Sequence, residues 1–147
     1  MRRFKTKVLV ALTASLAGLT FSMPQAAQAQ PQAQPLGTCV DGQSPAGLSG
    51  TTVRELRFPS GSVYQLRYNA GTTCAWGRIV MGRVGDTLWV DRAWTWADTQ
   101  NGNWQPWLGY TSIRSGGSVY TTAWDDDRHY MRACGESQGH LACTGWY

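Results

Sequence analysis

Four cysteines constrain the fold of this chain more than any other feature of its sequence: Cys39, Cys74, Cys134 and Cys143. An even number of cysteines in a small exported protein indicates a disulfide framework, and four cysteines allow three pairings. We favour Cys134–Cys143, which are close in sequence across a glycine-containing turn, and therefore Cys39–Cys74. No metal site is expected, because the sequence has no Cys-x-x-Cys pair and an oxidising compartment consumes free thiols.

The first 29 residues have the three parts of a secretory signal peptide. A basic start at residues 2–7 precedes an apolar run from Val8 to Phe21, and Ala27-Gln28-Ala29 supplies the small-x-small pattern of a cleavage site. The apolar run has 14 residues, whereas a membrane-spanning helix needs about 20. We therefore expect cleavage after residue 29 and a secreted, extracellular protein that does not stay in the membrane.

Cleavage would leave a short linker, one domain and no net charge. Residues 30–36 are rich in glutamine and proline, which predicts a disordered linker, and residues 37–147 have the length of a single domain. After residue 29 the chain has nine arginines, no lysine and nine acidic residues, so its formal charge is zero. Without a basic excess we expect neither nucleic acid nor anionic lipid as a partner, and we expect a monomer.

Short strands separated by turns dominate the sequence pattern after residue 53. Residues 63–68 alternate between apolar and polar side chains. The predicted apolar face of this strand carries Tyr64, Leu66 and Tyr68. Residues 79–81 and 88–90 are predicted to pair as a hairpin with a loose turn, and a last strand is predicted to run through residues 129–132.

Further turn signals complete the prediction of the fold. Pro106 cannot donate a backbone hydrogen bond and therefore indicates an edge strand. Gly116-Gly117 predicts a tight turn that sets Ile113 against Tyr120. Turns spaced about ten residues apart, without a sustained helical pattern, indicate a mainly β domain. We expect a small antiparallel β-sandwich or barrel that is held by two disulfides.

Asn101-Gly102 is the strongest short hairpin signal in the chain. If these two residues form the loop, Trp96 faces Trp107 across the two strands. Trp94 then lies on the same face, and Trp104 points to the opposite side. Two faces of one hairpin cannot both point into the core, so some of these rings are expected to be exposed.

Tryptophan is abundant, with eight residues, all after residue 37, beside six tyrosines. Tryptophan is highly buried on average, so we expect about half of these rings to lie in the core. Exposed rings offer a flat apolar face and a polar N–H, which suits the binding of sugars or prolines. The predicted ligand-binding residues are Trp94, Trp96, Trp104 and Trp107, with Asn101 and Asn103 as neighbouring hydrogen-bonding groups.

Several short motifs support a family resemblance. They are Val63-Tyr64-Gln65-Leu66-Arg67-Tyr68, Cys74-Ala75-Trp76-Gly77-Arg78-Ile79, Gly85-Asp86 before a strand, Arg132-Ala133-Cys134, and the ending Cys143-Thr144-Gly145-Trp146-Tyr147. These motifs resemble the YjfA-like family of small secreted proteins of unknown function from Gram-positive bacteria. The resemblance implies secretion and this type of fold, and it implies no particular activity.

Residues with catalytic potential do not form a recognisable set. Asp125-Asp126-Asp127 lacks the alternating spacing of a calcium loop, so we interpret it as a solvated turn whose acids pair with Arg128 or Arg132. His129 is the candidate general base of a small secreted hydrolase or nuclease, with Glu55 or Glu136 as a partner. No Gly-x-Ser-x-Gly motif supports a serine nucleophile.

These observations favour binding over catalysis. The main prediction is a secreted binding protein that recognises a polysaccharide or cell-envelope polymer through its tryptophans. One alternative is an inhibitor of a secreted protease or other enzyme, presenting a rigid loop at residues 98–103. A second alternative is the hydrolase or nuclease that uses His129. No cofactor is expected.

Overall fold

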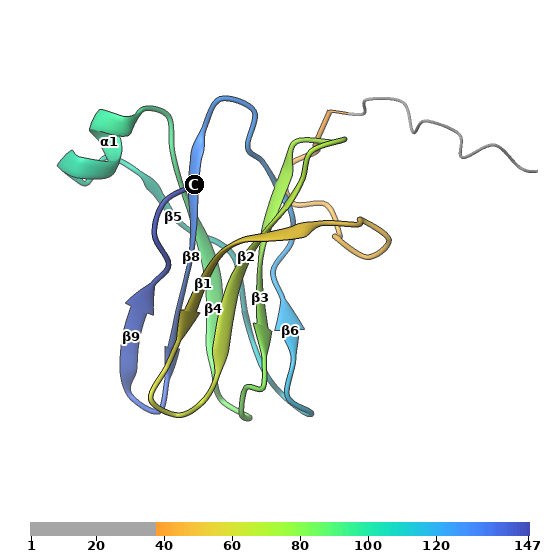
Figure 1. Ribbon diagram of the computed structural model, residues 1–147, viewed down its shortest axis with the longest axis vertical. Helices are drawn as coiled ribbons and strands as arrows, with labels where there is room; N and C mark the ends of the chain where they lie inside the picture. The colour runs from red at the N-terminus through yellow and green to blue at the C-terminus, as the bar shows by residue number, and fades with distance from the viewer. Residues whose placement is uncertain (1–37) are drawn as a thin grey trace, which may run out of the picture. The chain divides into compact units, whose positions relative to one another are not determined.

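The computed structural model describes residues 38–147, so the predicted signal peptide (1–29) and linker (30–36) lie outside the described residues. Two antiparallel sheets pack face to face (Figure 1). The predicted mainly β fold is therefore confirmed, in its sandwich form. Within residues 38–147 one short helix, α1 (Trp96–Asn101), accompanies the strands.

The two sheets contain nine strands in the described part of the chain. The first sheet has the order β1-β2-β3-β6, with β7 also paired to β3, and the second has the order β5-β4-β8-β9. The first sheet consists of β1 (Thr51–Arg57), β2 (Val63–Asn69), β3 (Cys74–Val80), β6 (Val119–Tyr120) and β7 (Trp124–Asp125). The second consists of β4 (Thr87–Ala93), β5 (Gln105–Ser112), β8 (Tyr130–Ser137) and β9 (His140–Cys143).

The core lies between the sheets and follows the alternation of the strands. Tyr64 and Leu66 of β2 are fully buried against Leu88 and Val90 of β4. Tyr68 packs at the margin of this core, so the predicted apolar face of residues 63–68 is confirmed. Each fully buried apolar side chain contributes about 1.5–3 kcal/mol relative to an exposed one. Burial therefore fixes which residues of β4 and β8 must point outward.

The predicted hairpin at Asn101-Gly102 is wrong. Thr95 is the N-cap of α1, and its hydroxyl accepts a hydrogen bond from the Asp98 N–H at 3.1 Å. The Asp98 carboxylate accepts one from the Thr95 N–H at 3.0 Å, which completes a capping box. Gly102 ends the helix in the left-handed conformation, with φ 79°. The Asn-Gly pair therefore terminates a helix, and the predicted pairing of Trp96 with Trp107 does not form.

The predicted hairpin of residues 79–81 with 88–90 is also wrong. β3 and β4 belong to different sheets. Ile79 of β3 and Leu88 of β4 both point into the core between the two sheets. The connection between these strands therefore crosses from one sheet to the other.

The predicted tight turn at Gly116-Gly117 does not pair Ile113 with Tyr120. Ile113 is buried in the core, and Tyr120 pairs with Arg78 of β3. The predicted last strand lies at the start of β8, and β9 follows it unpredicted. Pro106 lies in β5 at the edge of its sheet, as predicted.

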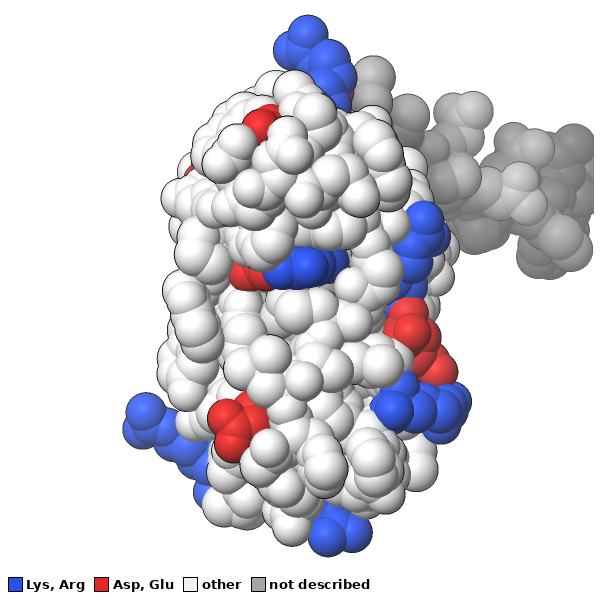
Figure 2. Space-filling model, turned by 90° about the vertical axis from the view of Figure 1, so that its left-hand side faces the viewer, with Lys and Arg blue, Asp and Glu red and all other residues white. Residues whose placement is uncertain are grey.

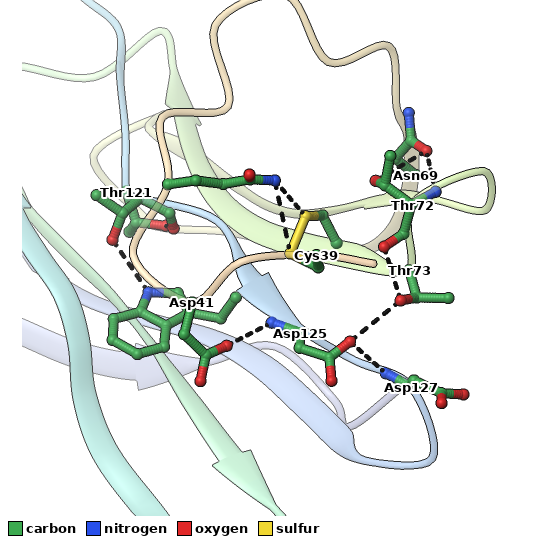
Figure 3. Close-up of a disulfide and its surroundings, with 12 residues drawn as sticks. Cys39, Asp41, Asn69, Thr72, Thr73, Thr121, Asp125 and Asp127 are labelled. Atoms are coloured by element: carbon green, nitrogen blue, oxygen red, sulfur yellow. Dashed lines mark hydrogen bonds between the residues drawn. A yellow bond between two sulfur atoms is a disulfide. The ribbon is translucent and has the colours of Figure 1, made fainter. Parts of the chain in front are cut away.

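Both predicted disulfides are present. Cys39–Cys74 ties the N-terminal arm to β3, and the Gln43 side-chain amide donates to the Cys74 sulfur at 2.8 Å (Figure 3). Cys134–Cys143 joins two directly paired residues of β8 and β9. Two disulfides in a domain of this size are typical of an oxidising environment. Across residues 38–147, no helix is both long and apolar enough to cross a membrane.

Candidate binding surface

The outward side of the β5-β4-β8-β9 sheet carries a group of aromatic rings. Leu88 and Val90 of β4 fill the core, so alternation turns Trp89 and Asp91 outward. By the same alternation Arg132 of β8 points outward, and it is the register partner of Asp91. We define the aromatic face as Trp89, Asp91, Trp104, Trp107, Tyr110, Arg132 and Trp146.

Three rings stack at one end of the aromatic face. The centroids of Trp89 and Trp107 are 4.1 Å apart with the planes 29° apart, and Tyr110 lies 6.2 Å from Trp89. Trp89 is buried, whereas Trp107 and Tyr110 are 54% and 56% exposed. Trp89 is therefore a floor that supports two solvent-exposed rings.

Trp107 has an unusual backbone conformation for a bulky residue. Its φ is 64°, and the pairing of β4 with β5 shifts register on both sides of Val90. A β-bulge redirects side chains, and positive φ costs of order 1–3 kcal/mol outside glycine. Such strain concentrates at functional sites, and here it places the Trp107 ring over Trp89.

An arginine lies between two rings at the other end of the aromatic face. The Arg132 guanidinium carbon is 4.4 Å from the ring centroid of Trp104 and 4.4 Å from that of Trp146. The two rings also meet edge to face at 5.6 Å. Each cation–π contact stabilises this arrangement by about 0.5–1 kcal/mol or more. The three side chains thus hold one another in place.

A buried ion pair connects the two ends of the aromatic face. Arg132 donates from Nε and from Nη2 to the Asp91 carboxylate at 2.9 Å each. Burial raises the pKa of Asp91, and the hydrogen bond and charge of Arg132 oppose that rise, with smaller contributions from Trp107 and Trp89. Asp91 follows Trp89 by two residues on the same side of β4, so the ion pair lies beside the stacked rings.

This side of the molecule is largely uncharged. Figure 2 shows an acidic and a basic side chain next to each other in a central hollow, with mostly uncharged surface around them. Asp91 also lies within 4.8 Å of the sulfurs of Cys134 and Cys143. These sulfurs are bonded to each other, so they are not thiolate ligands, and the three residues do not form a metal site.

Sequence comparison places the chain in a family without a known function. A family model described as "Protein of unknown function (DUF2690)" matches residues 38–134. The chain belongs to this family. The DUF2690 match contains the whole aromatic face except Trp146. No curated protein and no solved structure matches the chain significantly.

Two of the four predicted tryptophans belong to the aromatic face of this DUF2690 protein. Trp104 contacts Arg132, and Trp107 stacks on Trp89. Trp96 meets Tyr130 edge to face at 5.6 Å, and Tyr130 precedes Arg132 by two residues on the same side of β8. Trp96 therefore extends the aromatic face toward α1.

The other predicted binding residues lie elsewhere. Trp94 lies away from the aromatic face. The centroid of its ring is 6.4 Å from that of the His129 ring and 6.0 Å from the guanidinium carbon of Arg92. Asn101 and Asn103 are exposed on either side of Gly102, the C-cap of α1. Residues 98–103, the rigid loop of the inhibitor hypothesis, form the second half of this helix and its C-terminal cap.

The acidic run differs from its interpretation as a solvated turn. Asp125 accepts hydrogen bonds from the Thr73 hydroxyl and the Asp127 N–H, and Asp41 accepts one from the Asp125 N–H (Figure 3). Asp127 pairs with Arg128 at 3.5 Å, as predicted. Asp126, however, is buried. Burial first and the neighbouring Asp125 second raise its pKa to about 8.

The residues of the hydrolase hypothesis are spread over the molecule. Within residues 38–147, His129 forms no hydrogen bond or ion pair with a carboxylate. Glu136 lies seven residues along from His129, which is roughly 23 Å in an extended strand. Glu55 is on β1, where it binds Gln65 and Arg57. Among the residues that the structure describes, no acid–base pair therefore forms around His129.

Sequence reasoning missed Trp89, Asp91, Tyr110, Arg132 and Trp146. The alternation of residues 87–93 was a usable signal, because it separates Leu88 and Val90 from the outward residues between them. The pairing of Asp91 with Arg132 depends on the register of β4 and β8. Strand register between distant segments is not visible in one sequence.

Proposed function

We propose that this protein is secreted and binds an uncharged extracellular polysaccharide or cell-envelope polymer through the aromatic face. The observation that supports this most is the exposed Trp107, held in a strained conformation over Trp89. A strained residue needs surrounding structure to maintain it, and natural proteins keep such strain mainly where it serves a function. The flat ring it presents is suited to stacking on the apolar face of a sugar.

The charge of the aromatic face favours a neutral polymer. Arg132 is neutralised by Asp91 and is enclosed by the rings of Trp104 and Trp146. Arg132 therefore offers no unpaired charge to a polymer with many anionic groups. The remaining exposed groups are aromatic rings, which bind by shape and apolar contact.

The length of the aromatic face favours a polymer over a small molecule. Tyr110 and Trp107 lie near the stacked end, Trp104 and Trp146 at the ion-paired end, and Trp96 continues toward α1. Separate aromatic contacts along one sheet face suit successive rings of an extended chain. Such exposed apolar patches on small proteins are often functional.

A pull-down assay tests the proposal. The secreted form, beginning at residue 30, is titrated with insoluble peptidoglycan, chitin, cellulose and xylan while intrinsic tryptophan fluorescence is recorded. We expect saturable binding to at least one polymer, with a fluorescence change. Trp107→Ala should weaken the binding to that polymer at least about tenfold, as expected for the loss of a central aromatic contact.

Trp94→Ala is the matched control, because Trp94 is 52% exposed and lies off the aromatic face. It should bind like the wild type. The proposal is contradicted if no polymer binds, or if Trp107→Ala binds as well as the wild type. Equal losses in the two variants would also contradict it.

A further inference from the structure

A second hollow lies on the opposite side of the sandwich, over the β1-β2-β3-β6 sheet. Its volume is about 240 Å³. The side chains that line it include Arg67, Trp76, Arg78 and Tyr120, with Pro45 and Leu48 of the N-terminal arm. We call it the arginine pocket. The aromatic face and the arginine pocket are on outward sides of different sheets and share no residue.

Strand register brings the polar and aromatic groups of the arginine pocket together. Arg67 of β2 is directly opposite Trp76 of β3, and Arg78 of β3 is directly opposite Tyr120 of β6. Directly paired residues project to the same side of a sheet, and residues two apart in one strand do so as well. Both arginines therefore reach the pocket from neighbouring strands.

Trp76 forms the buried base of the arginine pocket. Only 5% of its surface is exposed, and it packs with Cys39, Cys74 and Ala123. Leu48 packs against this group from the N-terminal arm. The Cys39–Cys74 disulfide therefore fixes the arm that supplies the apolar wall, and the pocket is part of the folded framework.

The two arginines have no acidic partner in the part of the chain that the structure describes. Ion pairs there involve Arg57, Arg92, Arg128 and Arg132, and neither Arg67 nor Arg78 is among them. Burial, and then the nearby charge of Arg78, lower the pKa of Arg67. Two adjacent cations without a counter-charge repel each other, and an anion between them would relieve that repulsion.

Arg67 is held ready for a ligand. It donates to the Thr52 hydroxyl at 2.7 Å and to the carbonyl oxygen of Gly50. A guanidinium has five N–H donors, so further donors stay free after these two bonds. Because its position is already fixed, a ligand would pay less of the entropic cost of ordering this side chain.

We propose that the arginine pocket binds an oxyanion, a phosphate or carboxylate group, carried on a molecule that also has a ring or apolar part. The guanidinium groups of Arg67 and Arg78 hold the oxyanion by charge-assisted hydrogen bonds. The ring or apolar part lies against Tyr120 and the wall formed by Leu48. The pocket is smaller than the roughly 300–1,000 Å³ of sites for drug-sized ligands, so it accepts one such group of a larger ligand.

This site is independent of the aromatic face, and its test uses different probes. The secreted form is titrated by calorimetry with phenyl phosphate, benzoate and inorganic phosphate, with phenol as the uncharged control. We expect saturable binding of phenyl phosphate and benzoate, weaker binding of inorganic phosphate, and no binding of phenol. Raising the salt concentration should weaken the binding, because it depends on charge.

Arg78→Gln is the decisive variant, because among the described residues Arg78 has no hydrogen bond that its loss would disturb. Its dissociation constant for phenyl phosphate should rise at least about tenfold, since charge-assisted hydrogen bonds are the strong ones. Arg57→Gln, in the same sheet but paired with Glu55, is the matched control and should bind like the wild type. The proposal would be overturned if neither phenyl phosphate nor benzoate bound in a saturable manner, or if Arg78→Gln bound phenyl phosphate as well as the wild type.

Discussion

The buried ion pair of the aromatic face makes a pH-dependent prediction about stability. We consider the substitution Arg132→Met, which keeps an apolar stem between Trp104 and Trp146 but removes the cation. The Asp91 side chain is only 3% exposed, so its carboxylate would remain in the protein without its partner. The cost of that change depends on whether the carboxyl can take up a proton.

The magnitude follows from the two interactions that Arg132 makes. Removing one partner of a buried ion pair costs about 3–5 kcal/mol, and the lower end applies because Arg132 is itself 19% exposed. Burial already raises the pKa of Asp91, and Arg132 opposes that rise. In the variant the pKa rises further above its unfolded value, so native stability is lost as pH increases above about 4.

We therefore expect a loss of about 3 kcal/mol at pH 8. At pH 4.5 the raised pKa leaves more of the orphaned carboxyl protonated, so the cost of removing Arg132 should be smaller there than at pH 8. The two cation–π contacts contribute about 1–2 kcal/mol of the cost at either pH. Urea unfolding of wild type and variant at both pH values measures this difference. Asp91→Asn/Arg132→Met has no carboxyl at residue 91, so its own free energy of unfolding should lose the pH dependence that Asp91 contributes. An Arg132→Met cost that is equal at both pH values, or larger at pH 4.5, would refute this reasoning.

Three other substitutions test the framework. Removing the Cys39–Cys74 disulfide, which spans 35 residues, should lower the free energy of unfolding by about 4 kcal/mol. Removing Cys134–Cys143, which spans nine residues, should lower it by about 3 kcal/mol. Denaturant titration showing the reverse order would contradict this. Wild-type stability should fall between pH 4 and 8, because Asp126 ionises in the unfolded protein above about pH 4 but keeps its proton in the native protein until its raised pKa of about 8. Asp126→Asn should remove that fall and be the more stable form at pH 8, and thermal unfolding showing no difference there would count against it. Gly135→Ala should destabilise by about 1–3 kcal/mol, because a Cβ there would meet the ring of Tyr64 and the backbone; an unchanged melting temperature would contradict this.

The sequence predicted the fold class because its signals were local. The alternation of residues 63–68 fixed one strand and its buried face, and both disulfides followed from cysteine spacing. Asn101-Gly102 misled because the same dipeptide can turn a hairpin or end a helix. The capping box of Thr95 and Asp98 was present in the sequence and distinguishes the two.

The candidate site was only half predictable, for a different reason. Trp104 and Trp107 were identified by residue type and by their closeness in sequence to Asn101-Gly102. Asp91 and Arg132 gain their roles from strand pairing between segments about forty residues apart, which the sequence does not display. Trp94 was grouped with the site through a hairpin that does not form. Long-range register therefore decided which tryptophans share a surface.

The most direct test of the proposed function is to observe which tryptophans a bound glycan contacts. Indole N–H signals of the ¹⁵N-labelled protein are assigned with single Trp→Phe variants and followed during titration with soluble fragments of whichever polymer binds. Signals of Trp104, Trp107 and Trp146 should shift in a saturable manner, whereas those of Trp76 and Trp124 should not. Shifts confined to Trp94, Trp76 or Trp124, with the aromatic face unchanged, would contradict the account.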